Sequence, residues 1–374
     1  MNRRTRTISR IMGLLFLLAL AAQVPLASAT ITNYVGSCAS GGYATISAAL
    51  ATTPAPNFVY VCPGNYAEQV VITKPVTLEG IYTSNAGQAF INIPSGGLSS
   101  DNPCSAVGAA QVCVSSSGTV NITNISVDGS GATAPVGIAY SNSSGTMNHL
   151  EVRFQQGNGL GIGIYVYGTG TVTVENSNVH SFDFTGILAG GNTDQNVKIE
   201  KNTIEGEPDS ETAIEASFTN STTITGNVIN GPSAPAGCAP SLGYYCAGMV
   251  VVPANTGSVS NNTIAGVGGG YAGIHLLGLG DYPTTMSVTS NAIFDIAGDG
   301  IQLDTSEAAL PPMIIKDNFI TQTQNGINFT CNLDNNVSSN IITAVSGYGL
   351  ANLTSGETST NTYYNVPTLD STCP

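Results

Sequence analysis

A short motif recurs about every 25 residues along the chain: a small residue, usually glycine, is followed by an aliphatic residue that begins an alternating run. The aliphatic positions lie 23 to 27 residues apart, except for a single interval of 35 residues. They are Ile138, Ile164, Ile187, Ile214, Met249, Ile274, Ile301, Ile327 and Leu350. Self-similarity at this period is typical of a solenoid, in which each repeat forms one coil and only stacking buries its apolar side.

A second motif, an apolar pair followed by Asn-x-Ile, keeps the same period. Its asparagines are Asn202, Asn227, Asn262, Asn291, Asn318 and Asn340, whereas Ile125, Leu150 and Ser177 occupy this position in earlier copies. Asparagine suits a bend because it tolerates the left-handed backbone conformation, can bond its own backbone, and can stack on an asparagine one coil away. Apolar residues alternate within short runs of Val, Ile and Thr, and no stripe of helical period is long enough for a repeat helix. The sequence therefore predicts an all-β fold, a right-handed parallel β-helix.

Both ends of the chain lack this repeat. Residues 1–29 resemble a signal peptide, with four arginines, an apolar stretch over 11–22 and small residues at 27–29. The apolar stretch is too short to span a membrane, and no later segment is long enough. An uncleaved anchor is the alternative. We expect cleavage and a secreted, periplasmic or cell-surface protein.

The remaining chain divides into a cap, a solenoid and a tail. Residues 30–57 are predicted to form an N-terminal cap with a short helix over 43–53, because a solenoid needs its first coil covered. The β-helix itself is expected over residues 58–353, and residues 354–374 as a C-terminal tail that caps the last coil. The 35-residue interval between Ile214 and Met249 indicates a coil with an extra loop.

Eight cysteines in an exported chain indicate disulfides. Proximity in the sequence favours the pairs Cys38–Cys62, Cys104–Cys113, Cys238–Cys246 and Cys331–Cys373, although other pairings stay open. The sequence contains no Cys-x-x-Cys motif, and its three histidines are scattered, so no metal site is predicted.

The charge balance excludes two classes of partner. Four of the nine basic residues lie in residues 1–29, so the mature chain has five against 23 acidic ones, a net charge of 5 − 23 = −18. Such a chain repels nucleic acid and anionic membranes. Its uncharged polar surface suits a polysaccharide or cell-surface glycan as partner. No cofactor is expected. The acidic run 205–211 offers the oxygen ligands that Ca²⁺ takes, but such a run of charges favours a solvated loop at a bend over a cation site.

The segment 58–80 includes the phrase Gly64-x-Tyr66-x-Glu68 after the predicted helix. It resembles the start of proteins of the pectin-lyase-like β-helix superfamily, pectin methylesterases among them, and the later repeats are similar to generic right-handed β-helix repeats. This resemblance covers residues 40–353 and implies the fold without implying an activity. The catalytic motifs of pectin methylesterases and polygalacturonases are missing, apart from an isolated Asn192-Thr193-Asp194.

Alternation in the Gly-Ile strands predicts which side chains face outward. The first outer column is Ala139, Tyr165, Leu188, Glu215, Val250, His275, Gln302, Asn328 and Ala351, and the second includes Tyr167 and Asp304. His275, Asp304 and Glu215 are the candidate catalytic residues, and Tyr165, Tyr167, Gln302 and Asn328 the candidate substrate-binding residues. His275 and Asp304 are expected one coil apart on a diagonal. Glu215 and Asp304 are expected three coils, or about 14 Å, apart.

Two functions fit this outer face. The first is an exported protein that binds or adheres to polysaccharide. The alternative is a polysaccharide-active enzyme, a lyase or glycoside hydrolase. The absence of every complete catalytic motif favours the first, and a polar face that merely stays hydrated fits too. Catalysis, the identity of the glycan and the oligomeric state stay open.

Overall fold

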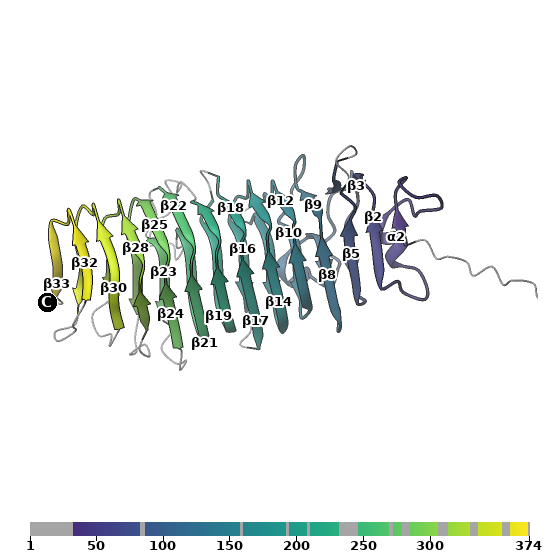
Figure 1. Ribbon diagram of the computed structural model, residues 1–374. Helices are drawn as coiled ribbons and strands as arrows, with labels where there is room; N and C mark the ends of the chain where they lie inside the picture. Colours follow the sequence, from purple (N-terminus) through teal and green to yellow (C-terminus); the bar gives the residue numbers. More distant parts are fainter. Residues whose placement is uncertain are drawn as a thin grey trace, which may run out of the picture. The chain divides into compact units, whose positions relative to one another are not determined.

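The computed structural model describes residues 33–82, 87–157, 160–191, 194–207, 210–231, 246–268, 272–278, 285–305, 313–329, 336–353 and 360–372. Over these residues the chain is a right-handed parallel β-helix, as predicted, and all pairings between its named strands are parallel. Figure 1 shows the strands following one another side by side along the stack, from β2 to β33. The signal peptide prediction, residues 1–29, lies outside the described residues.

Each coil contributes a strand to each of three parallel sheets. Sheet 1 contains the Gly-Ile strands: β4 (Val70–Ile72), β7 (Ala110–Val114), β10 (Val136–Ser141), β13 (Ile162–Tyr167), β16 (Thr185–Gly190), the first parts of β19 (Thr212–Thr225) and β21 (Ala247–Ser260), β23 (Ala272–Gly278), β26 (Asp299–Thr305), β29 (Ile327–Phe329), β31 (Tyr348–Leu353) and β33 (Thr368–Thr372).

Sheet 2 follows sheet 1 in each coil. It contains β1 (Tyr34–Val35), β2 (Phe58–Val61), β5 (Val76–Gly80), β8 (Thr119–Thr123), β11 (Ser144–Asn148), β14 (Gly170–Glu175), β17 (Gln195–Glu200), the second parts of β19 and β21, β24 (Thr285–Thr289), β27 (Ile314–Lys316) and the start of β30 (Asn336–Thr343).

Sheet 3 completes the coil. It contains β3 (Gly64–Ala67), β6 (Ala89–Asn92), β9 (Ile125–Asp128), β12 (Glu151–Arg153), β15 (Asn178–His180), β18 (Thr203–Glu205), β20 (Val228–Asn230), β22 (Thr263–Val267), β25 (Ala292–Ile296), β28 (Phe319–Thr321), the end of β30 and β32 (Thr360–Tyr364), whose first residue pairs in sheet 2.

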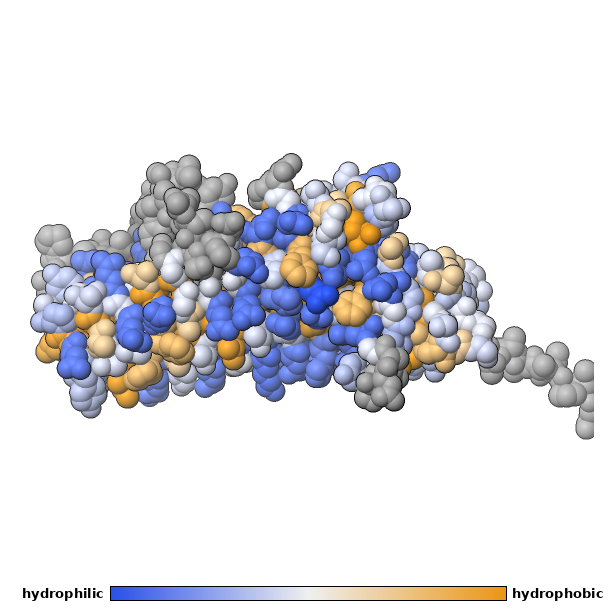
Figure 2. All heavy atoms as spheres, turned by 90° about the horizontal axis from the view of Figure 1, so that it is seen from above, coloured by the Kyte–Doolittle hydropathy of each residue, from blue (hydrophilic) through white to orange (hydrophobic). Residues whose placement is uncertain are grey.

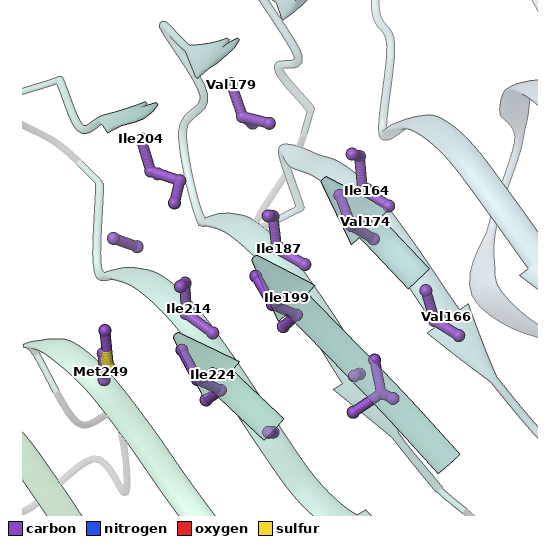
Figure 3. Packing of buried hydrophobic residues seen from close by; sticks show 14 of the residues in the cluster. Ile164, Val166, Val174, Val179, Ile187, Ile199, Ile204, Ile214, Ile224 and Met249 are labelled. Carbon is purple, nitrogen blue, oxygen red and sulfur yellow. The ribbon is translucent and has the colours of Figure 1, made fainter. Parts of the chain in front are cut away.

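The predicted inward column of sheet 1 is confirmed. Ile274, Ile301, Ile327 and Leu350 lie opposite one another in successive strands, and all four are fully buried. They pack against the inward residues of the other two sheets. Figure 3 shows this packing, with Ile164, Ile187 and Ile214 from sheet 1, Val174, Ile199 and Ile224 from sheet 2, and Val179 and Ile204 from sheet 3.

The glycine of the repeat is required by close packing at the bend between sheets 3 and 1. A Cβ atom on Gly273 would lie 2.6 Å from Cγ2 of Ile293 and 2.8 Å from the carbonyl oxygen of Gly300. A Cβ atom on Gly300 would likewise lie 2.4 Å from Cγ2 of Ile320 and 2.6 Å from the carbonyl oxygen of Gly326. Both are shorter than van der Waals contact, so the recurring glycine lets sheet 1 begin against the isoleucines of sheet 3. Ala213 shows that one coil accommodates a methyl group.

The asparagines stack as a ladder at the bend between sheets 2 and 3. In one step, the backbone N–H and the Nδ2 of Asn262 both donate to Oδ1 of Asn291 at 3.0 Å, while Nδ2 also donates to the carbonyl oxygen of Ile224 at 3.0 Å. Ser177 begins the ladder by donating its backbone N–H to Oδ1 of Asn202. Asn361, which the sequence motif misses, accepts from Asn340 and ends it. The ladder thus satisfies buried backbone groups at a bend that has no strand pairing.

The left-handed conformation expected of these asparagines belongs to their neighbours instead. Lys201, Asn261, Ser290 and Asp317, each preceding a ladder asparagine, have φ between 56° and 59°. No ladder asparagine has a positive φ. The expectation of a left-handed conformation was therefore wrong for these asparagines. Their side chains bond the neighbouring coils instead, and Asn227 also donates to the carbonyl oxygen of Thr225 in its own turn at 3.3 Å.

A short helix covers the first coils, although it is shorter than the predicted 43–53. Helix α2 (Ile46–Leu50) begins after Thr45, whose side chain accepts the N–H of Ala48 at 3.1 Å. Glu68 accepts the N–H groups of Ile46 and Ser47 at 2.7 and 2.9 Å, so it stabilises the first turn through charge and hydrogen bonding. The N-terminal cap also contains a strand, β1, which pairs with β2.

The C-terminal segment differs from the expected tail. Residues 360–372 form β32 and β33, which pair in parallel with β30 and β31 and so continue the solenoid beyond Leu353. Buried and exposed residues do not alternate clearly in this segment, because its strands are largely exposed. Exposure is expected for the last coil, since no further coil covers it.

Two predicted disulfides, Cys38–Cys62 and Cys104–Cys113, are confirmed. Cys246 is also disulfide-bonded, but Cys238, Cys331 and Cys373 lie outside the described residues, so the pairings predicted for them stay predictions. Over the described ranges, no helix has the length and apolar character needed to span a bilayer.

The asparagine ladder predicts the effect of Asn291→Ala. The change removes the acceptor of two donors of Asn262 and the donor to the carbonyl oxygen of Val259. Because all these groups are buried, we expect the free energy of unfolding to fall by about 2–4 kcal/mol in urea denaturation. Asn178→Ala, on the exposed side of β15, is the matched control and should change it by less than about 0.5 kcal/mol. Equal losses in the two variants would contradict a stabilising role of the ladder.

Candidate functional site

The outer face of sheet 1 contains the candidate site residues in the expected register. Tyr165, Leu188, Glu215, Val250, His275, Gln302 and Asn328 lie opposite one another in successive strands from β13 to β29. Asp304 pairs with Leu277, so it lies one strand away from His275 on a diagonal. The register brings these side chains to one face; their role as a site stays a prediction.

This outer column is not uniformly exposed, contrary to expectation. Ala139, Val250, His275 and Ala351 are buried, with only 3% of Val250 exposed. Alternation determines the face of the sheet but says nothing about what covers that face. Val250 and Val252 form an apolar cluster with Ala247, against which Phe218 and Leu277 pack. This cluster separates Glu215 from His275 and divides the candidate site into two halves.

The N-terminal half carries a pair of tyrosines on β13. The ring centroids of Tyr165 and Tyr167 are 5.9 Å apart, and the planes are tilted by 48°. Both rings are half-buried and pack against an apolar cluster that includes the Cys104–Cys113 disulfide. Burial, with a smaller effect of Glu215, raises the pKa of Tyr165, so its hydroxyl stays neutral and can donate a hydrogen bond.

Glu215 lies two strands beyond Tyr165. Its Oε1 accepts a hydrogen bond from the Ser217 hydroxyl at 2.8 Å. Burial raises the pKa of Glu215, whereas this hydrogen bond lowers it. Burial, and then the charge of Glu215, also raises the pKa of Glu211. Two partly buried carboxyl groups therefore belong to this half, although the outer columns indicated only Glu215.

The C-terminal half carries the His275–Asp304 pair. Nε2 of His275 is 3.8 Å from Oδ2 of Asp304. The two side chains differ sharply in exposure, 1% for His275 and 44% for Asp304. Burial lowers the pKa of His275 to about 4, although the Asp304 carboxylate acts in the opposite direction. At neutral pH this histidine is therefore uncharged.

Asp299 is a further acidic residue of this half that the outer columns did not predict. It is 6% exposed, and its two carboxylate oxygens accept from Nδ2 of Asn325 and Nδ2 of Asn328, each at 2.7 Å. Burial raises its pKa, and the two asparagines lower it. The repeat contained a sign of this residue. Earlier strands have Thr212, Ala247 and Ala272 at the position of Asp299, so a carboxylate stands out there.

The hydrogen bonds of Asn328 restrict its predicted role in substrate binding. Its Nδ2 donates to Asp299, and its Oδ1 accepts from Nδ2 of Asn352 at 3.0 Å. Gln302, one strand earlier, has a buried Oε1 without a hydrogen-bond partner among the described residues. The amide of Asn328 is thus engaged, and Oε1 of Gln302 is covered rather than presented to a ligand.

The arrangement restricts the chemistry of the face. The register puts Glu215 and Asp304 three strands apart, about 14 Å, which exceeds the separation of glycosidase carboxyl pairs.

Arg153, the only arginine after residue 29, lies on sheet 3 and pairs with Asp128 and Glu151 at 2.9 and 3.0 Å. Among the described residues, no three His, Cys, Asp or Glu side chains are grouped to hold a metal ion.

The surface seen in Figure 2 mixes hydrophilic and hydrophobic residues. Such a surface offers many uncharged hydrogen-bonding groups and short apolar stretches, in agreement with the low charged fraction of 9%.

Several solved structures are similar to this chain at low sequence identity and with TM-scores below 0.5. The pectin methylesterase from Aspergillus niger is 19% identical, over 69% of this chain and 84% of its own, with a TM-score of 0.44. An alginate lyase from Paenibacillus sp. str. FPU-7 is 14% identical, over 90% and 99%, with a TM-score of 0.46. The A-module of a mannuronan C-5 epimerase from Azotobacter vinelandii is 13% identical, over 87% and 94%, with a TM-score of 0.49.

These likenesses concern the fold alone. None of the curated proteins matches the sequence. A family model described as "right handed beta helix region" matches residues 162–365, more than half of the chain. Together with the parallel coils of the structure, this match shows that the chain belongs to the right-handed β-helix family.

Proposed function

We propose that this chain is an exported β-helix protein that binds polysaccharide through the outer face of sheet 1. The observation that carries the proposal is the half-buried pair Tyr165 and Tyr167 on the same face as Glu215, Gln302 and Asp304. Aromatic rings can pack against the apolar faces of sugars, while amides and carboxylates can bond sugar hydroxyls. A parallel sheet presents these groups on a rigid surface, which lowers the entropic cost of binding.

Export is supported by the disulfides. Cys38–Cys62 and Cys104–Cys113 are the kind of crosslink that persists in oxidising compartments. The predicted signal peptide would deliver the chain to such a compartment. A secreted, periplasmic or cell-surface location follows from the proposal.

Binding is favoured over catalysis by the state of the candidate catalytic groups. His275 is buried and uncharged at neutral pH, and Glu215 is far from Asp304. A general acid and a general base must both reach one bond of the substrate. Glu215 and Asp304, three strands apart, do not meet this requirement, and His275 is buried.

The alternative is a polysaccharide lyase or glycoside hydrolase. The observation in its favour is the proximity of His275 to Asp304, together with the buried carboxyl group of Asp299 on the same face. Titratable groups with shifted pKa values are common at active sites. This alternative makes the C-terminal half of the face the catalytic part.

The tyrosine pair predicts the behaviour of a Tyr165→Leu/Tyr167→Leu variant. Leucine keeps the apolar packing against the Cys104–Cys113 cluster but removes both aromatic faces and hydroxyls. We expect binding to a panel of soluble neutral and anionic polysaccharides to weaken about tenfold, in isothermal titration with the best ligand of the wild type. Tyr364→Leu removes an exposed tyrosine from sheet 3 and should leave binding unchanged. Undiminished binding by the double variant would place the site elsewhere.

Asp304→Asn separates binding from catalysis. Asp304 is well exposed, and asparagine has nearly the same shape, so the fold should tolerate the change. If the face only binds, the variant should lose about 1–3 kcal/mol of binding free energy, and neither protein should release sugar products. If the face is catalytic, the wild type should turn over a polysaccharide of the panel and the variant should not. Turnover by the wild type, with or without Ca²⁺, would therefore exclude the purely binding function.

The buried histidine predicts a pH dependence of stability. Its pKa is lower in the folded state than the usual 6.5, so the unfolded chain takes up the proton first as the pH falls. Stability should therefore decrease between pH 6.5 and about 4, by on the order of 1–3 kcal/mol from this group. His275→Gln cannot titrate and should show a weaker decrease when unfolding free energies are compared across this range. His149→Asn, at an exposed bend, is the control and should lose stability with falling pH as the wild type does. If His275→Gln lost as much unfolding free energy as the wild type over this range, the assignment to His275 would be wrong.

A further inference from the structure

A regular array of hydroxyl groups covers part of the outer face of sheet 2. In residues 221–225, 256–260 and 285–289, the first, third and fifth positions are all Ser or Thr. These positions face outward, since none of them is buried, whereas Ile224, Val259 and Val288 between them are fully buried. We call these nine residues the hydroxyl grid. Figure 1 shows the three strands that carry it, β19, β21 and β24, in the middle of the stack.

The grid is held in register by the backbone. Thr223, Ser258 and Ser287 form its central column, in which each residue lies opposite the next without a register shift. Neighbouring strands are about 4.8 Å apart, and alternate residues of a strand are about 6.6 Å apart. The grid therefore presents hydroxyls at two fixed repeats, and the buried residues between them keep it rigid.

The hydroxyls of the grid remain available to a partner. Ser260 donates to Thr225 at 3.2 Å, and this is the only side-chain hydrogen bond of the nine residues within the described part of the chain. The grid also lacks ionised side chains, although the chain has a net charge of −14. Lys198 and Glu200 border it on one side and Lys316 on the other.

Strand propensity alone does not explain this composition. Threonine is favoured in strands because its branched side chain packs well on a pleated surface, but serine is not among the favoured residues. Four of the nine positions are serine. What the nine residues share is the hydroxyl group, an uncharged donor and acceptor.

We propose that the hydroxyl grid binds the surface of an insoluble, uncharged polysaccharide. Such a surface repeats its own hydroxyl groups at fixed spacings, so several weak hydrogen bonds can form together with a rigid grid at little entropic cost. None of the nine grid residues is charged, and the charged residues on its borders are of both signs, Lys198 and Lys316 with Glu200. This favours an uncharged partner over an anionic one. The inference concerns sheet 2 and does not depend on the proposed role of the sheet 1 face.

The test is Ser258→Lys, which introduces a long charged side chain at the centre of the grid. Adsorption of the full-length mature protein to microcrystalline cellulose and to chitin particles is measured from the free protein concentration. For the particle that the wild type binds better, we expect the partition constant to fall about tenfold or more. Thr146→Lys is the matched control, because it adds the same charge in β11, in the same column of sheet 2 but outside the grid. It should bind as the wild type does, as should Ser258→Thr.

The other outcomes overturn the proposal. They are a wild type that binds neither particle, Ser258→Lys binding like the wild type, and equal losses in Ser258→Lys and Thr146→Lys. Sedimentation that shows a wild-type dimer lost in Ser258→Lys would assign the grid to a second copy of the chain. Matching unfolding midpoints of the variants exclude misfolding as the cause. Soluble-polysaccharide binding should survive Ser258→Lys, and particle binding should survive the double tyrosine variant, so failure of either site is recognised separately.

Discussion

Each coil of this protein depends on its neighbours, because a single coil can satisfy neither its backbone groups nor its apolar side. The parallel ladders join residues some 25 positions apart, and the inward columns fill the interior between them. The same dependence governs the bends. At the bend between sheets 2 and 3, buried asparagines take over the role of strand pairing by bonding the next coil. Stability in such a structure arises from interfaces between neighbouring repeats.

The repeat motif was sufficient to predict the fold and the inward column of sheet 1. Glycine and isoleucine recur because packing leaves no room for a Cβ atom at the first position and requires an apolar side chain at the second. The asparagine ladder could likewise be predicted, since one side chain per coil lies at the same bend. The last coil could not be predicted, because its strands are exposed and lack the alternation of the other strands.

The candidate site was only partly predictable, for a physical reason. Alternation and register gave the face and the neighbours of Tyr165, Glu215 and His275. They could not give the burial of His275, which depends on contacts beyond its own strand. Nor could they give the side of Asp299, which is the first residue of β26 and precedes the Gly300-Ile301 pair where the predicted alternation starts.

Burial also gives the two halves of the sheet 1 face different electrostatic characters. Burial raises the pKa values of Tyr165 and Glu215 in one half, and it lowers the pKa of His275 in the other. The valines between them keep the two groups apart. Burial therefore opposes charge in both halves, even though the chain as a whole is strongly acidic.

The single long repeat shows where this architecture can change. Asn227 and Asn262 are 35 residues apart, yet Asn227 donates to Asn262 at 2.9 Å as in every regular step, and Ile214 still faces Met249. The additional residues fall between sheets 3 and 1, a bend that the asparagine ladder does not cross. Chain length at this bend is thus uncoupled from the periodicity of the fold. Evolution, or an engineer, can lengthen the chain there without disturbing the stack, while an insertion between sheets 2 and 3 would break the ladder.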